Sequence, residues 1–335
     1  MGYSIVVDAM GGDYAPEAPV EGALAALRAF DDLTVTLLGD TAAIEKVLEG
    51  KEYNRDRLHI LHTTQVVENE EKSPADAIRR KKDSSMAVAM RMVKEKKADG
   101  MVSAGNTGAL LAGATLLVGR IPGILRPALS IALPTGEKPT LVLDVGANMD
   151  CKPAYLVQFA QMSSIYYRAQ YGVESPRVGL LNVGAEDGKG NALTKEAYPM
   201  LKEEAALNFA GNIEARDVFA GAVEIAVCDG FAGNILLKTV EGAAGFILSL
   251  MKETISQSVK GKVGGLLLKE DLRGVKHKLD PSSVGGTPLL GVDGAVIKAH
   301  GNSKAAAMAN AIGQCRRFLQ SGVNEDIHKN INPDH

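Results

Sequence analysis

The sequence lacks tryptophan and has few other aromatic residues, since Phe and Tyr make up only 4% of its 335 residues. A core must therefore be built from aliphatic side chains and alanine, and a chain of this length can bury a core of ordinary size. The three cysteines, Cys151, Cys228 and Cys315, are widely spaced, with no CxxC and no nearby pair of histidines. This pattern argues against a disulfide framework and a zinc site, so we expect reduced thiols and no bound metal.

A basic surplus is also lacking, because 37 Lys and Arg stand against 40 Asp and Glu, giving a net charge of −3. This balance argues against a general nucleic-acid binder. The opening residues, MGYSIVVDAM, lack the features of a secretory signal. The longest uncharged stretch, 101–119, is interrupted by polar residues and is too short to span a bilayer. We therefore expect a cytoplasmic protein without a transmembrane helix.

The usual catalytic signatures are missing as well. The segment GAEDGKG (184–190) is one residue short of a Walker A motif and lacks its Ser or Thr, and there is no GxGxxG, HExxH or GxSxG. Nucleotide, nicotinamide and metal chemistry thus have no support in the sequence. We expect no cofactor.

What is present is a regular alternation of strand-like runs and helical patterns. Strands are predicted near 3–8, 33–39, 57–63, 99–104, 128–133, 140–145, 177–183 and 223–228. Helices are predicted near 17–30, 40–50, 84–97, 106–119, 152–171, 192–207 and 230–257, with a final helix over 302–320. The alternation predicts an α/β protein with a mainly parallel sheet covered on both faces. No linker or repeat divides residues 1–335, so we predict one α/β/α unit, with a frayed polar tail from residue 324.

Five turns rich in Gly, Asp and Asn each follow a predicted strand. They are DAMGGDYAP (8–16), SAGNTGAL (103–110), LDVGANMD (143–150), LLNVGAEDGKGN (180–191) and CDGFAGN (228–234). In a parallel α/β sheet, the loops at the carboxyl ends of the strands converge on one crevice, where ligands bind. Glycine lets backbone N–H groups approach an anion, and helix N-termini add partial positive charge. Asp and Asn also form ordinary turns, but five such turns favour a ligand site.

Two residues of these turns stand out chemically. Lys189, between two glycines, can reach a phosphate oxygen or a developing oxyanion, although it can equally be a solvated loop lysine. Asn234 can aim its amide at the crevice or merely cap the following helix. The other candidates to bind substrate or phosphate are the polar and glycine residues Asp8, Gly11, Gly12, Asp13, Asn106, Asp144, Asn148, Asn182, Asp229 and His300. Of these, His300 by itself is better explained as a turn residue.

Two surface features remain. The stretch 235–259 carries apolar residues at helical spacing with few charges on any side, which suggests burial against another subunit. It is followed by Val263, Leu266, Leu267 and Leu268 between lysines, a pattern suited to an anionic membrane surface or to packing within the protein or its dimer. The basic run RRKK (79–82) is either a solvated face or a contact for an acidic partner or an anionic substrate, and the serines after it are positioned to cap a helix.

Taken together, the turns resemble a known family. DAMGGD, SAGNTGA, LDVGANMDCKP with QFAQM, GLLNVGAEDGKG, NFAGNIEARD, DGFAGNILLK and HGNS occur in the order and approximate spacing of the bacterial phosphate acyltransferases of phospholipid synthesis, the PlsX family. The resemblance covers essentially the whole chain. It implies transfer of a long-chain fatty acyl group from acyl carrier protein to inorganic phosphate, giving acyl phosphate for phosphatidic acid synthesis.

The resemblance also implies a homodimer with a three-layer α/β/α, Rossmann-like fold related to phosphotransacetylases and isocitrate-type dehydrogenases. The segment near 235–275 is then the dimerisation and membrane-facing part, attached to the inner face of the membrane near the downstream glycerol-3-phosphate acyltransferase. The family's catalytic lysine falls on Lys189 and its asparagine on Asn234. Tyr14 stands where a histidine is usual, and Asn302 where a serine is usual.

Two other functions stay open from the residues alone. A phosphotransacetylase-like enzyme that uses a coenzyme A thioester would share the crevice. A noncatalytic scaffold that recruits carrier protein to membranes would need the basic and apolar patches but neither Lys189 nor Asn234.

Overall fold

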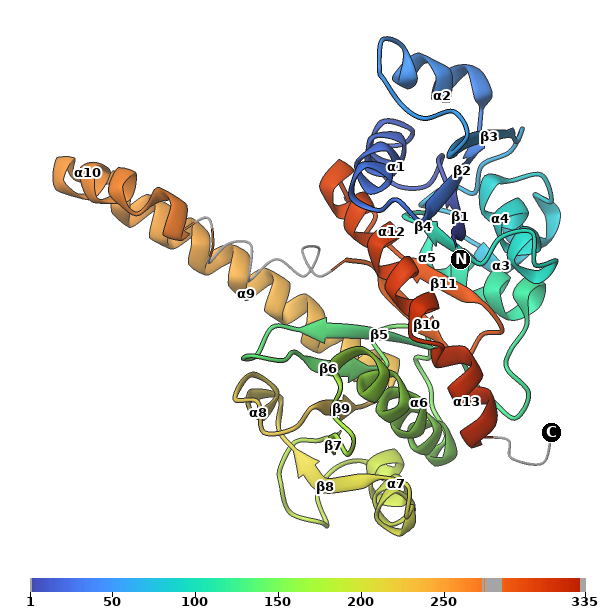
Figure 1. Ribbon diagram of the computed structural model, residues 1–335. Helices are drawn as coiled ribbons and strands as arrows, with labels where there is room; N and C mark the ends of the chain where they lie inside the picture. The colour runs from blue at the N-terminus through green and yellow to red at the C-terminus, as the bar shows by residue number, and fades with distance from the viewer. Residues whose placement is uncertain (1, 273, 275–284, 332–335) are drawn as a thin grey trace.

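The computed structural model describes residues 2–272, 274 and 285–331. One sheet of eleven strands runs through it in the order β3-β2-β1-β4-β11-β10-β5-β6-β9-β7-β8, and helices lie on both of its faces (Figure 1). Seven of its ten strand pairings are parallel, so the predicted mainly parallel α/β/α sheet is confirmed.

The strands are β1 (Tyr3–Asp8), β2 (Leu33–Gly39), β3 (Leu58–His62), β4 (Gly100–Ser103), β5 (Ala128–Leu133), β6 (Thr140–Leu143), β7 (Arg177–Leu181), β8 (Asn208–Ile213), β9 (Ile225–Val227), β10 (Thr287–Leu290) and β11 (Ala295–Lys298). The helices are α1 (Glu17–Ala29), α2 (Thr41–Leu48), α3 (Pro74–Arg80), α4 (Ser85–Lys94), α5 (Thr107–Gly113), the π-helical η1 (Ala114–Val118), α6 (Pro153–Tyr171), α7 (Ala192–Glu203), α8 (Ala215–Phe219), α9 (Gly230–Ser256), α10 (Val259–Leu267), α12 (Ala305–Gln320) and α13 (Val323–Ile331).

The central strands are buried on both faces. In β1, Ile5 and Val7 join one apolar cluster under α1, α12 and α6, whereas Val6 joins the other under α4 and α5. Successive side chains of a strand point to opposite faces, so a continuous apolar run is what a doubly covered parallel strand requires. The two clusters are the two cores of the three-layer fold.

The direction of the strands reverses in the middle of the sheet. The pairings β11–β10, β10–β5 and β5–β6 are all antiparallel, and three reversals in succession leave β6, β9, β7 and β8 running opposite to β3, β2, β1, β4 and β11. The five Gly-rich turns do follow β1, β4, β6, β7 and β9. However, their carboxyl ends do not share one edge of the sheet, as a uniformly parallel sheet would require. The loops of the two halves meet instead around β5 and β10.

One prediction about the helices is wrong, and several elements were not predicted. The expected frayed tail is α13, because Val323 and Ile327, four residues apart on one face, are fully buried. The strands β8 and β10 and the helices α3 and α8 are short elements that the periodicity did not predict. The serine prediction is confirmed, since Oγ of Ser84 accepts from the backbone N–H of Ala87 at the start of α4.

The helix α9 leaves the body of the molecule and forms, with α10, a projecting arm (Figure 1). Most of its apolar side chains are exposed in this single chain, among them Phe231, Ile235, Phe246, Ile247 and Leu250. By length and composition alone α9 is apolar enough to cross a bilayer, contrary to our expectation, which considered only the stretch 101–119. One such helix is weak evidence for a membrane span. Residues 273 and 275, within the predicted 235–275 segment, lie outside the described residues.

Candidate active site

A groove of about 1220 Å³ lies where the two halves of the sheet meet, between α9 and the turns after β4 and β11. Its polar lining side chains include Asp13, Asn69, Asn106, Asn234, Lys238, Glu241, Lys298, His300 and Lys304. Its apolar lining side chains include Leu129, Ile131, Leu237, Leu248, Ala306 and Ala307. This volume suits a substrate with a charged group and a long apolar part.

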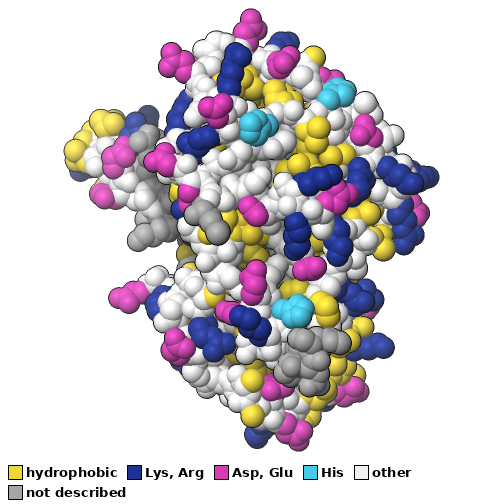
Figure 2. Space-filling model, turned by 45° about the vertical axis from the view of Figure 1, so that its right-hand side comes forward, with side chains coloured by type: hydrophobic (Ala, Val, Ile, Leu, Met, Phe, Trp, Pro, Cys, Tyr) yellow, Lys and Arg dark blue, Asp and Glu magenta, His cyan; other side chains and the backbone are white. Residues whose placement is uncertain are grey.

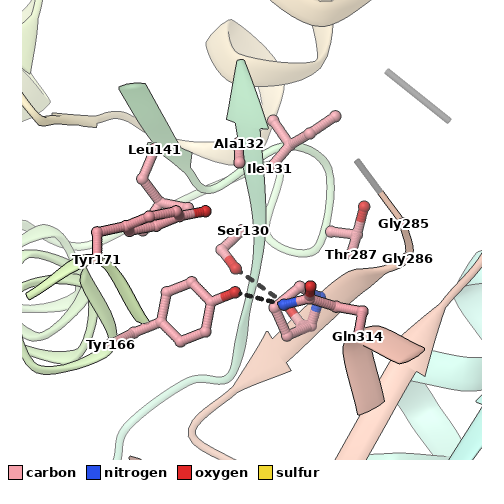
Figure 3. Close-up of a pocket in the computed structure, with 11 residues that line it drawn as sticks. Ser130, Ile131, Ala132, Leu141, Tyr166, Tyr171, Gly285, Gly286, Thr287 and Gln314 are labelled. Carbon is pink, nitrogen blue, oxygen red and sulfur yellow. Dashed lines mark hydrogen bonds between the residues drawn. The ribbon is translucent and has the colours of Figure 1, made fainter. Parts of the chain in front are cut away.

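A second cavity lies in the core between β5, β10, α6 and α12, and it is too small to be a substrate site. Its volume is about 20 Å³, roughly the space for one water molecule. In Figure 3 the side chains of Tyr166 and Gln314 point toward each other, and Gln314 Nε2 donates to the Tyr166 hydroxyl at 2.8 Å. This contact joins α6 to α12 and has a structural role.

The turns after β1, β4 and β11 pack tightly on one another. A Cβ on Gly11 would lie 2.7 Å from the backbone nitrogen of Gly105, and one on Gly12 would lie 3.0 Å from the backbone oxygen of Gly301. Gly12 also has φ +100°, a conformation that side chains disfavour. The DAMGGD glycines therefore act by letting three loops come together, and Asp13 N–H donates to the Gly301 oxygen at 2.8 Å.

Asp13 and Asn106 are linked at the rim of the groove. Asn69 Nδ2 donates to Asp13 Oδ1 at 3.0 Å, and Asn106 Nδ2 donates to the backbone oxygen of Asn69 at 2.8 Å. Asn106 Oδ1 also accepts from the backbone N–H of Ala109 at the start of α5. These two predicted residues thus share the groove, with part of their polar capacity used by the fold.

Asp8 lies fully buried beneath these turns. Its carboxylate accepts from Ser85 Oγ at 2.6 Å and from Ser103 Oγ at 2.7 Å. Burial raises the pKa of this carboxyl, and the two serine hydrogen bonds oppose that rise. Asp8 does not line the groove, so it is better placed to hold β1, α4 and β4 together than to touch a ligand.

Lys298 is a groove residue that the sequence did not indicate. It ends β11, its side chain is 8% exposed, and it lines the groove. Burial lowers the pKa of its ammonium to about 8, while the charges of Asp8 and Asp13 act in the opposite direction. The signal that would have found it is a lone lysine at the carboxyl end of the apolar run AVIKA, because unpaired buried lysines are rare.

The turn after β6 is organised by Asp144. Its carboxylate accepts from the backbone N–H groups of Leu129, Ala147 and Asn148, and from Asn148 Nδ2 at 3.0 Å. Burial raises the pKa of the Asp144 carboxyl, and these hydrogen bonds oppose the rise. Asn148 Nδ2 also donates to Pro127 O. Both predicted residues are therefore occupied in holding the turn, and neither lines the groove.

The start of α9 is seated on this turn. A Cβ on Gly233 would lie 1.9 Å from the backbone oxygen of Asp144, so only glycine permits the contact. Asp229, rather than Asn234, caps the helix, since its Oδ1 accepts from Ala232 N–H at 2.7 Å. The cap reading of Asn234 is therefore wrong. Asn234 is half-buried, lines the groove and faces Gly146, whose missing side chain leaves space next to the amide.

Lys189 lies in the exposed turn between β7 and α7. Asn182 Nδ2 donates to the backbone oxygen of Lys189 at 3.1 Å. Asn182 therefore holds the conformation of the turn. Gly190 has φ +101°, and a Cβ there would lie 2.0 Å from Thr194 Oγ1. Among described residues Lys189 has no ion pair, and it does not line the groove. Of the five Gly-rich turns, the turn after β7 is thus the one that contributes no lining residue to the groove.

His300 lines the groove and also closes its own turn. Its Nδ1 accepts from the Asn302 backbone N–H at 3.4 Å, and its backbone oxygen accepts from Ser303 N–H at 3.0 Å. Both interpretations of His300, as a groove residue and as a turn residue, are therefore consistent with the structure.

Tyr14, which stands where the family resemblance places a histidine, is 46% exposed, and the Lys304 ammonium lies 5.7 Å from the centre of its ring.

The cysteines near the site are poor nucleophiles. Burial and the charge of Asp144 raise the pKa of the Cys151 thiol to about 12 and raise that of Cys228 well above its ordinary value. A thiolate is the reactive form of cysteine. Neither thiol is therefore suited to form a covalent acyl intermediate near neutral pH. Within the described ranges, no cluster of His, Cys, Asp and Glu suits a metal ion.

The two predicted surface patches are both accessible. Val263, Leu266, Leu267 and Leu268 lie on or just after α10 and are 51–79% exposed, and hydrophobic side chains are visible at the end of the arm in Figure 2. In the basic run, Lys81 is held by Glu71 at 3.5 Å and by the backbone oxygen of Val66. The other three residues of the run are exposed.

Comparisons with known proteins agree with the sequence resemblance. A family model described as fatty acid synthesis protein matches residues 3–326. Over 329 residues the chain is 53% identical to a phosphate acyltransferase of Clostridioides difficile, covering 98% of this chain and 96% of that one.

Solved structures show the same fold. A phosphotransacetylase from Streptococcus pyogenes superposes with a TM-score of 0.59 at 15% identity, covering 96% of this chain and 94% of that one. A 4-hydroxythreonine-4-phosphate dehydrogenase from Klebsiella pneumoniae superposes with a TM-score of 0.56 at 12% identity, covering 96% of this chain and 100% of that one. At these identities the likeness concerns the fold alone.

Proposed function

The chain belongs to the fatty acid synthesis protein family and is a phosphate acyltransferase, and from this premise we propose that its donor is long-chain acyl carrier protein and its product an acyl phosphate. The observation that carries the proposal is the groove, which combines polar and charged side chains with apolar walls. The polar side chains suit phosphate and a thioester carbonyl. The apolar walls, formed by β5, α9 and α12, suit a fatty acyl chain rather than an acetyl group.

In the proposed reaction a phosphate oxygen attacks the thioester carbonyl carbon. The new C–O bond forms as the C–S bond breaks, and the carrier thiolate leaves and takes up a proton. A thiolate leaves readily and phosphate is largely dianionic near neutral pH, so positioning and charge stabilisation carry the catalysis. Asn234 would donate its amide N–H to the carbonyl oxygen as it becomes an oxyanion. Lys189, from the neighbouring turn, would add a positive charge when substrate is bound.

The surface features extend the proposal to partners. Acyl carrier protein is acidic, so the exposed basic residues Arg79, Arg80 and Lys82 would speed encounter by electrostatic attraction. The exposed apolar side of α9 supports a homodimer, because a soluble chain rarely leaves so large an apolar face uncovered. The arm tip, with Leu266 and Leu267 between lysines, would place the enzyme on the anionic inner face of the membrane, near the acyltransferase that consumes its product.

The proposal is tested with a long-chain acyl carrier protein in a chelated, nucleotide-free buffer. Thioester should be lost only when inorganic phosphate is added, and hydroxylamine should trap the product as a hydroxamate, since a mixed anhydride reacts with it faster than a free acid does. Equal or better use of short coenzyme A thioesters would favour the phosphotransacetylase-like alternative. Carrier binding without turnover of any thioester would leave only the scaffold.

A further inference from the structure

Lys298 occupies the point at which the sheet changes direction. It pairs with Ser103 across the parallel β4–β11 ladder and with Thr287 across the first antiparallel ladder. Ligands in α/β proteins bind at the carboxyl ends of parallel strands, next to such switch points. A charged side chain that is 92% buried at this position and still lines the groove is placed to meet a ligand.

The hydrogen bonds of Lys298 leave part of its ammonium group unsatisfied. An ammonium has three N–H donors. Nζ donates to the backbone oxygens of Ala104, at 3.4 Å, and of Ala299. No ion pair joins it to any residue in the described part of the chain. Among the described residues, one donor is therefore left without a protein acceptor, on a side chain that lines the groove.

The buried acid beneath it does not complete the site. The Asp8 carboxylate accepts hydrogen bonds from Ser85 Oγ, Ser103 Oγ and the backbone N–H of Met10. A buried cation with no bonded counter-ion destabilises the fold. Such groups are found mainly at functional sites, where a bound ligand can balance the charge. An oxyanion entering the groove would accept the free N–H and balance the charge.

We propose that Lys298 binds inorganic phosphate in the groove, on the β11 wall, while Asn234 lines the same groove from α9. The inference rests on the proposed function, because it gives the phosphate co-substrate a specific cation. The phosphodiester of the carrier's prosthetic arm has similar chemistry. The free anion is the co-substrate that the proposed reaction requires, and the separate KM values for phosphate and for the donor distinguish the two.

The direct test is equilibrium binding of inorganic phosphate to the whole enzyme, without acyl donor, by titration calorimetry. Lys298→Met should weaken binding by about tenfold or more, the effect of one charged hydrogen bond. The matched control is Lys195→Met, which removes an exposed lysine of α7 that does not line the groove. It should change affinity less than twofold. Unchanged affinity in a folded Lys298→Met protein would overturn the inference.

A second measurement needs no variant that might misfold. In the wild type, phosphate affinity should fall as the pH rises through about 8, because the ammonium then loses its proton. The titratable groups around the groove are Asp8 on β1, Asp13 in the β1 turn, Lys238 and Glu241 on α9, and His300 and Lys304 after β11. Lys195→Met, outside the groove, should keep the fall. A wild-type affinity that stays constant through this range contradicts the proposal.

Kinetics separate this inference from the proposed function. Lys298→Met should raise KM for phosphate about tenfold, with KM for the acyl donor unchanged. A rise in KM for the donor alone would assign the lysine to the donor's phosphodiester and overturn the inference. If no thioester turns over but phosphate binds in a Lys298-dependent way, the proposed function fails and the inference stands.

Discussion

Two charged residues, Asp8 and Lys298, are buried at the ends of β1 and β11, whereas the two candidate catalytic residues that follow β7 and β9 in the other half of the sheet are half-buried or exposed. Asp8 and Lys298 are 2% and 8% exposed, but Asn234 is half-buried and Lys189 lies on an open turn. A buried, preorganised cation suits holding a small anion in one place. Accessible groups suit contact with a large donor that must arrive and leave. The difference predicts that the first half governs affinity for phosphate and the second half governs the rate of the reaction.

The largest effect should come from the rate-governing half. Asn234→Ala and Lys189→Ala should each lower kcat about 100-fold or more, because each removes a group that stabilises charge in the transition state. Thermal melting should show little change, since Lys189 is exposed and Asn234, in the first turns of α9, is only half-buried. Lys195→Ala, an exposed lysine on α7, is the control and should retain wild-type turnover. Near-normal kcat in a folded Lys189→Ala protein would remove that residue from the mechanism.

The shape of the Lys189 turn should matter next. Gly190→Ala should lower kcat about tenfold or more, because alanine at φ +101° is strained and its Cβ would meet Thr194 Oγ1. Gly188→Ala is the matched control, since a Cβ there meets nothing within 4 Å. Steady-state rates of both variants check the prediction. Equal rates would show that the turn's conformation does not position Lys189.

An effect on stability, rather than on turnover, should come from the affinity-governing half. Between pH 8 and 10.5 the unfolded chain binds more protons at Lys298 than the folded chain does, so this group lowers stability fully below about pH 8 and progressively less as the pH rises. The difference in free energy of unfolding between wild type and Lys298→Met should therefore change by about 3 kcal/mol across this window. Urea denaturation at several pH values measures it. A difference that is independent of pH would contradict the buried, lowered pKa.

The smallest effect on catalysis should come from the tip of the arm, whose residues do not line the groove. Replacing Leu266 and Leu267 with Glu should abolish sedimentation with anionic vesicles and leave turnover of a soluble donor unchanged. Leu116→Glu, an exposed apolar residue on η1, is the control and should still sediment. If the double variant still binds vesicles, the tip packs within the dimer instead.

The sequence predicted the turn residues of the groove better than its buried cation, for a physical reason. Gly-rich turns after strands are local signals, and three residues of such turns, Asp13, Asn106 and Asn234, line the groove together with His300. The lone lysine of AVIKA was the available signal for Lys298, but only the placement of β4 and β10 beside it shows that this lysine is buried. Similarly, the reversal of the sheet depends on β10, four residues long, whose pairing is decided by tertiary contacts.

The proposed reaction is most directly tested by the fate of phosphate oxygen. Incubation of the enzyme with long-chain acyl carrier protein and phosphate labelled with ¹⁸O at all four positions should give acyl phosphate that retains the entire label, because a phosphate oxygen attacks the carbonyl and no P–O bond breaks. Mass spectrometry of the product reads this out. Release of free fatty acid without labelled acyl phosphate, at the same rate with and without phosphate, would contradict the proposed acyl transfer.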